Sequence, residues 1–125
     1  MNQEIKARWI AALKSGEYIQ GTKVLRSVDN RFCCLGVLCE LAVKEGVIPA
    51  SEVKEINTSV RDIKKAYGYD GSAFKLSMSV VNWAELKDQL PLASGPISDG
   101  YSLAYLNDTY KYDFHKIAAA IEEGL

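Results

Sequence analysis

The most apolar part of the chain is the run from Phe32 to Cys39, which contains no charged residue. This run is too short to cross a bilayer, because a membrane-spanning helix needs about 20 apolar residues. In a soluble protein, a helix that is apolar all round is covered on every side. With Gly46 as a C-terminal cap, the pattern predicts a buried central helix over residues 34–45.

Four other stretches repeat their apolar residues at helical spacing. They predict helices over residues 3–15, 78–86, 102–107 and 113–123. Asn2, Asp113 and either Ser77 or Ser79 stand where side chains that cap a helix N-terminus are favoured. Trp9 lies on the apolar stripe of the first helix, and this position favours the core over an exposed stacking platform.

Strand-forming side chains fill residues 18–33, where Asp29–Asn30 predicts a tight hairpin turn. The segment after the central helix allows two descriptions. One is a strand over Val53–Ile56, and the other is a short helix that begins at Ser51 or Thr58. Both remain open from the sequence.

Together these elements predict an α+β fold, with residues 1–125 forming a single compact domain. The helices are expected to pack around the buried central helix. A small antiparallel sheet is expected from residues 18–33 and from part of residues 53–75. The chain has a suitable length for one domain and for a core that needs no disulfide or metal.

The composition is that of a soluble globular protein, with 48% hydrophobic and 25% charged residues and a net charge of −1. Binding to a nucleic acid polymer requires a basic stripe, and here basic and acidic residues are interspersed. No apolar segment follows the first charged residues, so no signal peptide is predicted. We therefore expect a cytoplasmic protein that binds neither a membrane nor a nucleic acid polymer.

The chain contains three cysteines and one histidine, and these are its only soft metal ligands. Cys33, Cys34 and Cys39 would point in different directions around a helix, because successive residues turn by about 100°. His115 is expected on the polar side of the last helix. We therefore predict buried, reduced and unreactive thiols, no bound metal and no cofactor.

Arg26 and Arg31 flank the predicted hairpin turn. Two interpretations apply to this pair. They are solvated arginines on a hairpin, or they grip an anionic group together. The sequence favours the first interpretation.

Tyr67 and Tyr69 stand in a glycine-punctuated stretch that ends at Gly71, and we expect this stretch to be an aromatic turn. Its tyrosines either form a recognition surface or lean on the core. Asn107 and Asp108 stand at the end of a predicted helix, and their side chains suit either a helix stop or a ligand contact.

Several motifs together resemble a family of small proteins from tailed bacteriophages and prophages. The central motif, Arg31–Ala42, is the most distinctive of them. The others are Trp9, Tyr18–Gly21, Tyr67–Gly68, Val80–Leu86, Leu103–Asp108 and Phe114–Ile121. The chain departs from the pattern at Tyr110–Tyr112, where a turn containing glycine is more usual.

The resemblance implies an accessory phage protein that acts in the cytosol of an infected bacterium. Such proteins commonly counter host defence, either by sequestering a nucleotide-derived immune signal or by blocking a host protein. The resemblance carries no catalytic residue over to this chain. This context is an association with the family and does not follow from the chemistry of the residues.

The leading hypothesis is a non-catalytic protein that sequesters a small nucleotide-type ligand. Such a site needs cations for phosphate, aromatic rings for the base and polar groups for the ribose. The candidate residues are Arg26, Arg31, Tyr67, Tyr69, Asn107 and Asp108. A homo-oligomer could build such a site from two chains. The alternative is a protein-binding inhibitor of a host or defence protein, and the third hypothesis is an enzyme that degrades a nucleotide signal.

Overall fold

The computed structural model describes residues 1–56 and 62–125, and its helices follow the predicted ones closely. The helices are α1 (Gln3–Lys14), α2 (Cys34–Lys44), α3 (Met78–Ala84), α4 (Leu103–Asp108) and α5 (Phe114–Gly124). The strands are β1 (Ile19–Gln20), β2 (Arg26–Ser27), β3 (Arg31–Phe32), β4 (Glu52–Glu55) and β5 (Lys65–Gly68). The α+β fold is confirmed.

N-cap side chains set the starts of four helices, and the structure selects Ser77 over Ser79 as the cap of α3. The Asn2, Ser77 and Asp113 side chains accept hydrogen bonds from backbone amides in the first turns of α1, α3 and α5. Ser102 caps α4 in the same way. Each cap satisfies an amide that has no partner within its own helix.

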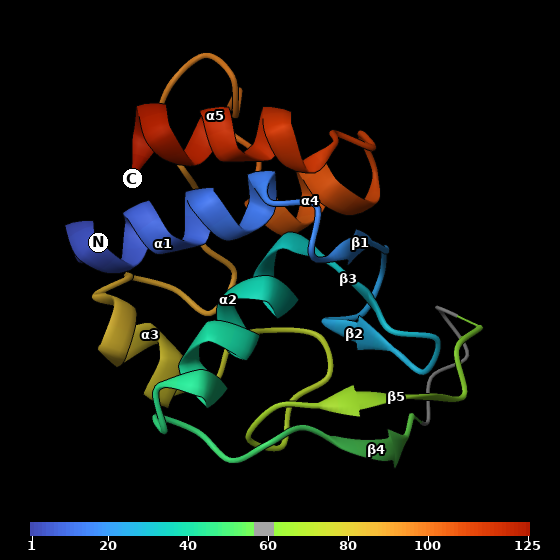
Figure 1. The fold of residues 1–125 in the computed structure, drawn as a ribbon. Coiled ribbons are helices and arrows are strands. Elements are labelled where there is room, and N and C mark those ends of the chain that lie inside the picture. The colour runs from blue at the N-terminus through green and yellow to red at the C-terminus, as the bar shows by residue number, and fades with distance from the viewer. Residues whose placement is uncertain (57–61) are drawn as a thin grey trace.

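The helices form a layered body with the sheet at one side (Figure 1). α1 and α5 lie side by side, and α2 runs beneath them through the centre of the molecule. Trp9 of α1 is fully buried and its indole N–H donates to the Cys34 carbonyl over 3.0 Å. The predicted core position of Trp9 is therefore confirmed.

The central helix is buried at its N-terminal half and partly open afterwards. Residues 34–39 are buried without exception, and Ala42 is buried one turn later. Glu40 and Leu41 are half-buried, while Lys44 is exposed. The helix is thus central as predicted, but the prediction that it is covered on every side was wrong for its second half. No helix that the structure describes is long and apolar enough to cross a membrane.

The sheet is mixed, and this corrects the prediction of a purely antiparallel sheet. Its order is β1-β3-β2-β5-β4. β2 pairs antiparallel with β3 and with β5, and β5 pairs antiparallel with β4, but β1 runs parallel to β3. The parallel pair arises because β2 pairs with one side of β3 and leaves the other side open. β1 pairs with that open side and runs in the same direction as β3.

The predicted turn at Asp29–Asn30 is confirmed, since Asn30 has a positive φ of 62° between β2 and β3. The aromatic stretch differs from its prediction, because Tyr67 and Gly68 belong to β5. A Cβ at Gly68 would lie 2.8 Å from the Lys54 Cδ atom, so the Lys54 side chain would have to move.

The tight turn comes later, at Asp70–Gly71, between the bridged residues Tyr69 and Ser72. Of the two descriptions left open for the preceding segment, the strand is found as β4. A helix beginning at Thr58 would lie outside the described residues.

Candidate functional site

Three of the six predicted site residues come together beside α2, namely Arg26, Tyr67 and Tyr69. β2 pairs Arg26 with Phe32 on one side and with Tyr67 on the other, so the three side chains share one face of the sheet. The Arg26 guanidinium carbon lies 4.0 Å from the centre of the Tyr67 ring and 5.2 Å from that of Phe32. The arginine is therefore held between two aromatic rings.

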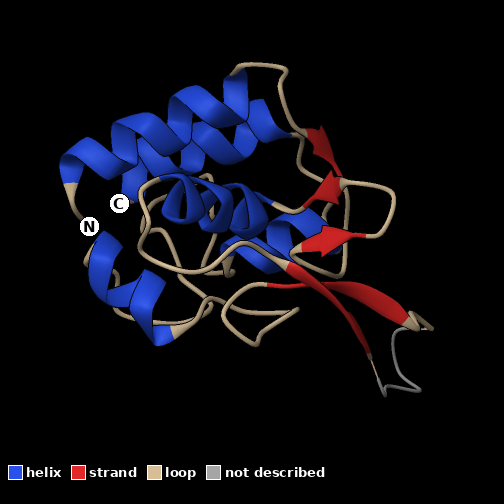
Figure 2. Ribbon diagram, turned by 60° about the horizontal axis from the view of Figure 1, so that its bottom comes forward, coloured by secondary structure: helices blue, strands red, loops and turns tan. Residues whose placement is uncertain are grey.

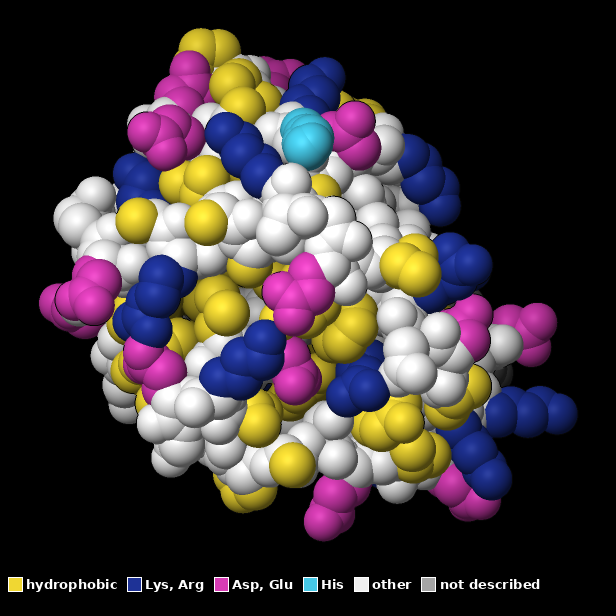
Figure 3. All heavy atoms as spheres, in the orientation of Figure 1, with side chains coloured by type: hydrophobic (Ala, Val, Ile, Leu, Met, Phe, Trp, Pro, Cys, Tyr) yellow, Lys and Arg dark blue, Asp and Glu magenta, His cyan; other side chains and the backbone are white. Residues whose placement is uncertain are grey.

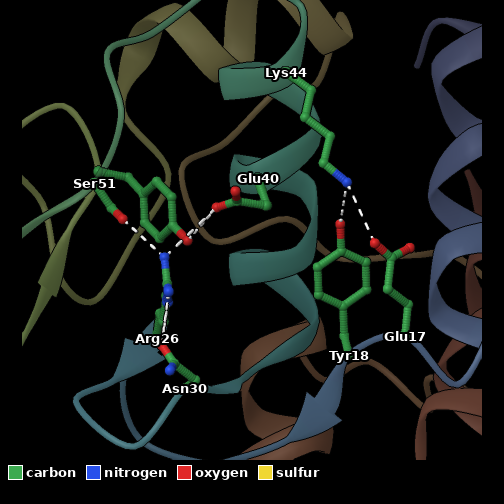
Figure 4. Close-up of polar contacts among 8 residues, drawn as sticks. Glu17, Tyr18, Arg26, Asn30, Glu40, Lys44 and Ser51 are labelled. Atoms are coloured by element: carbon green, nitrogen blue, oxygen red, sulfur yellow. Dashed lines mark hydrogen bonds and ion pairs between the residues drawn. The ribbon is translucent and has the colours of Figure 1, made fainter.

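The polar bonds of Arg26 are also made within the chain (Figure 4). Its guanidinium donates to the Asn30 amide oxygen over 3.1 and 2.6 Å and to the Ser51 hydroxyl over 3.1 Å. Glu40 of α2 lies 4.0 Å away. Arg26 thus links β2, its hairpin turn and α2, and an incoming phosphate would have to compete with these partners.

Tyr69 completes this cluster from the core side. It is 1% exposed, and its hydroxyl donates to the Glu40 carboxylate over 2.8 Å. Burial, followed by the neighbouring carboxylate, raises the pKa of Tyr69 far above its ordinary value. Of the two interpretations of this tyrosine, the structure places it against the core.

Arg31 lies away from Arg26. Its side chain is exposed and pairs with Asp29 over 3.2 Å. Hydrogen bonds from Ser27 and Arg31 lower the pKa of the Asp29 carboxyl. Because Arg26 pairs with Phe32, the next residue back on β3 points to the opposite face of the sheet, so the two arginines do not form a joint anion site.

Asn107 is fully buried and joins three segments of the chain. Its amide oxygen accepts from the Cys34 backbone N–H over 3.3 Å and from the Gln20 side chain over 2.8 Å. Its NH₂ group donates to the Gly21 carbonyl and to the Asp108 carboxylate, each over 2.9 Å. The N-cap residue of α2, Cys33, provides no side-chain hydrogen bond. Asn107, which is far away in the sequence, therefore caps this helix in its place.

The exposed side of α2 carries a second set of polar contacts. The Lys44 ammonium donates to the Tyr18 hydroxyl over 2.9 Å and lies 3.5 Å from the Glu17 carboxylate (Figure 4). The bond to Tyr18 raises the pKa of Lys44. On this face of the molecule, basic and acidic side chains alternate and no basic stripe is visible (Figure 3).

The sequence prediction missed an exposed aromatic cluster around α4. Tyr101, Tyr105 and Tyr110 are 37%, 40% and 45% exposed, although their rings pack on one another. Tyr101 and Tyr105 are stacked with their centres 4.8 Å apart, and Tyr110 meets them edge-on at 5.0 and 5.4 Å. The signal in the sequence was the four-residue spacing of Tyr101 and Tyr105, although Tyr101 precedes Ser102, the N-cap of α4.

Contacts within this cluster fix its geometry. A hydrogen bond to Tyr101, together with partial desolvation and nearby hydroxyls, raises the pKa of Tyr110 to about 12. Tyr112 stacks on Tyr110 at 6.0 Å, and Lys116 lies 3.8 Å over the Tyr112 ring. The rings therefore form one packed surface, and the Tyr110 hydroxyl stays protonated at neutral pH.

A groove of about 410 Å³ adjoins the aromatic cluster. Its walls include Lys23, Phe74, Lys75, Leu90, Tyr105 and Asp108. Leu90 is 46% exposed and faces this groove. We call Tyr101, Tyr105, Tyr110 and Leu90 the tyrosine surface. Asp108 is the only one of the six predicted site residues that lines this groove.

The cysteines lack the environment of a nucleophile. All three are free and buried, and burial raises the pKa of Cys33 to about 12 and those of Cys34 and Cys39 well above the ordinary value. His115 lies on the exposed side of α5, as predicted. Across residues 1–56 and 62–125, no three His, Cys, Asp or Glu side chains are placed to share a metal ion.

Thiol titration is expected to detect no rapidly reacting cysteine in the native protein at neutral pH. All three thiols should react once urea unfolds the chain. Because the folded pKa of Cys33 exceeds its ordinary value of 9.0, the free energy of unfolding should be unaffected below pH 9.0. It should fall as pH rises toward about 12. Rapid modification of all three thiols in the folded protein would contradict this prediction.

The geometry defines a single-domain α+β protein. Residues 1–125 match the family described as "Domain of unknown function (DUF8296)", and the chain belongs to this family. No curated protein and no solved structure matches the chain. The phage context remains a prediction from the sequence motifs.

Proposed function

We propose that the protein is a non-catalytic binding protein that recognises a protein partner through the tyrosine surface. The observation that carries this proposal is the exposed, mutually packed cluster of Tyr101, Tyr105 and Tyr110. Tyrosine is enriched among the residues that dominate protein interfaces, because it buries a large area and also donates a hydrogen bond. Rings already held by their neighbours lose little conformational entropy on binding.

The groove beside Tyr105 supports the same function. A volume of about 410 Å³ can receive one or two large side chains of a partner, and Leu90 gives it an apolar wall. Interfaces place their strongest contacts where an anchor side chain enters such a pocket. In the cytosol of an infected bacterium, as the motif resemblance suggests, this binding would block a host or defence protein.

The geometry favours a protein partner over the nucleotide ligand that led the sequence hypotheses. The two arginines expected to hold phosphate are engaged by Asn30, Ser51 and Glu40 in one case and by Asp29 in the other. Asn107 is buried and bonded within the chain. The polar groups proposed for phosphate and ribose thus do not converge.

The test is to identify a stoichiometric partner by pull-down from host lysate and then measure its affinity for purified variants. Tyr105→Ala should weaken binding by about 30-fold or more, since truncating a dominant interface residue costs at least about 2 kcal/mol. Tyr67→Ala is the matched control and should change affinity little. If Tyr67→Ala weakens binding and Tyr105→Ala does not, the surface beside Arg26 is the interface and the proposal fails.

Nucleotide sequestration is the second candidate, and one observation favours it. The groove brings Asp108 to the same walls as Lys23, Lys75 and the rings of Phe74 and Tyr105. These side chains offer cations for phosphate, rings for a base and a carboxylate for a ribose hydroxyl.

The second candidate requires ligand capture from an extract of defence-activated cells, followed by mass spectrometry of what the denatured protein releases. An unmodified nucleotide that is captured by wild type, lost in Lys75→Ala and retained in the control Lys87→Ala would support it. A nucleotide of changed mass would favour the degrading enzyme. Capture of no nucleotide from several extracts would leave the protein partner as the function.

A further inference from the structure

β4 forms one edge of the sheet and projects from the body of the protein as part of a hairpin (Figure 2). All four of its residues, Glu52–Glu55, are exposed. One side of the strand pairs with β5, and no other described strand pairs with its second side. An exposed edge presents backbone N–H and C=O groups that another strand can pair with.

The pairing of β4 with β5 determines which backbone groups point outward. Ile56 donates its N–H to the Lys64 carbonyl over 2.8 Å, so this pair is hydrogen-bonded. In an antiparallel ladder, hydrogen-bonded and non-hydrogen-bonded pairs alternate. Lys54 and Glu52 therefore direct their backbone groups toward β5, while Val53 and Glu55 direct theirs toward the open edge.

We propose that this edge binds a second copy of the same chain, with the two β4 strands antiparallel and Val53 opposite Val53. The two strands can form backbone hydrogen bonds only in registers that place outward-pointing residues of one copy opposite outward-pointing residues of the other. Of the two-fold registers within the strand, the one centred on Val53 places Glu52 of each copy opposite Lys54 of the other. Registers centred on Glu52, Lys54 or Glu55 place like charges directly opposite, which destabilises a sheet.

The neighbours of Val53 support this register. Val53 is 51% exposed and lies opposite Tyr67 on β5, so the two valines of a dimer would meet beside two tyrosine rings. The Lys54 ammonium donates to the Gly71 carbonyl over 2.9 Å, which holds its stem across β5 on the other face. The apolar contact and the charge pairs would therefore lie on opposite faces of a continuous sheet.

Charge reversal tests the proposed pairing by sedimentation equilibrium. Glu52→Lys alone and Lys54→Glu alone should each raise the dissociation constant of the dimer by about tenfold or more, because attraction becomes repulsion at two places. A mixture of the two variants should dimerise, since every cross-strand pair is then opposite in charge. The double variant Glu52→Lys/Lys54→Glu should also dimerise. If the mixture stays monomeric, the charge pairing is wrong.

Cysteine cross-linking tests the register independently. Val53→Cys should form an intermolecular disulfide, since facing residues of a hydrogen-bonded pair have Cα atoms about 5.5 Å apart, within disulfide reach. Lys54→Cys is the matched control and should not cross-link, because its diagonal separation of about 7–8 Å is too long. The native cysteines are buried and do not compete.

Two results would overturn the proposal. Cross-linking of Lys54→Cys but not of Val53→Cys would assign another register. A wild-type protein that stays monomeric at every attainable concentration would mean that the charges on β4 protect this edge from pairing, as charged side chains do on many edge strands. Neither result bears on the tyrosine surface, because none of its residues belongs to the β4–β5 hairpin.

Discussion

Replacing Leu38 with alanine is expected to lower the free energy of unfolding by about 2–5 kcal/mol. Leu38 is fully buried at the middle of α2, within the main hydrophobic core. Truncation removes apolar area from the core and leaves a cavity that the surrounding side chains fill only in part. A domain is typically stable by about 5–15 kcal/mol, so this loss is large enough to measure by urea unfolding.

Leu41→Ala is the matched control for this measurement. Leu41 lies on the same helix but is half-buried, so its truncation should cost clearly less. If Leu38→Ala fails to fold, Leu38→Met should still unfold cooperatively, because a swap that conserves volume costs less than about 1.5 kcal/mol. A loss below about 1 kcal/mol in Leu38→Ala would show that α2 does not organise the core.

The helices could be predicted because each combines an apolar stripe with a local stop or start signal. α1 begins after Asn2 and α5 begins after Asp113, at the residues whose side chains cap them. Such signals act over a single helical turn and are written in adjacent residues. The burial of Trp9 followed from the same stripe.

The sheet and the site depended on long-range pairing, which local patterns do not encode. Arg26 and Arg31 both flank a turn, yet the register of β2 against β3 sends them to opposite faces. Side chains alternate between the two faces of a sheet along a strand. A shift of the strand register by one residue therefore decides whether two such residues lie on the same face. The parallel pairing of β1 with β3 likewise depends on where β2 inserts.

The tyrosine surface was missed for a related reason. Tyr101 and Tyr105 carry a spacing that the sequence shows, but Tyr110 follows the end of α4. Its ring reaches the other two because the Thr109 and Tyr110 N–H groups both donate to the Tyr105 carbonyl, over 2.8 and 3.3 Å, which holds Tyr110 against the end of the helix. The chain then reverses at Lys111, which adopts a positive φ of 57°. A lysine therefore takes the conformation that glycine usually supplies.

Replacing Gly36 with alanine is expected to destabilise the protein by several kcal/mol, although alanine is the better helix former by about 1 kcal/mol. A Cβ at Gly36 would lie 1.8 Å from the Leu25 carbonyl oxygen and 2.7 Å from its carbonyl carbon. Leu25 is fully buried, and its carbonyl also accepts the Cys33 N–H over 3.2 Å. The chain before β2 crosses α2 at backbone distance, so the helix or the crossing segment must shift.

The sign of the change in the free energy of unfolding shows whether the close packing against Leu25 or the helix propensity of alanine dominates. Urea unfolding measures this change. Val43→Ala on the same helix is the control, because Val43 is half-buried and its truncation should cost only about 1 kcal/mol. Equal or greater stability in Gly36→Ala would mean that Leu25 does not approach α2 this closely. A large loss would explain the glycine of the central motif as the contact that lets the sheet and the buried helix share one core.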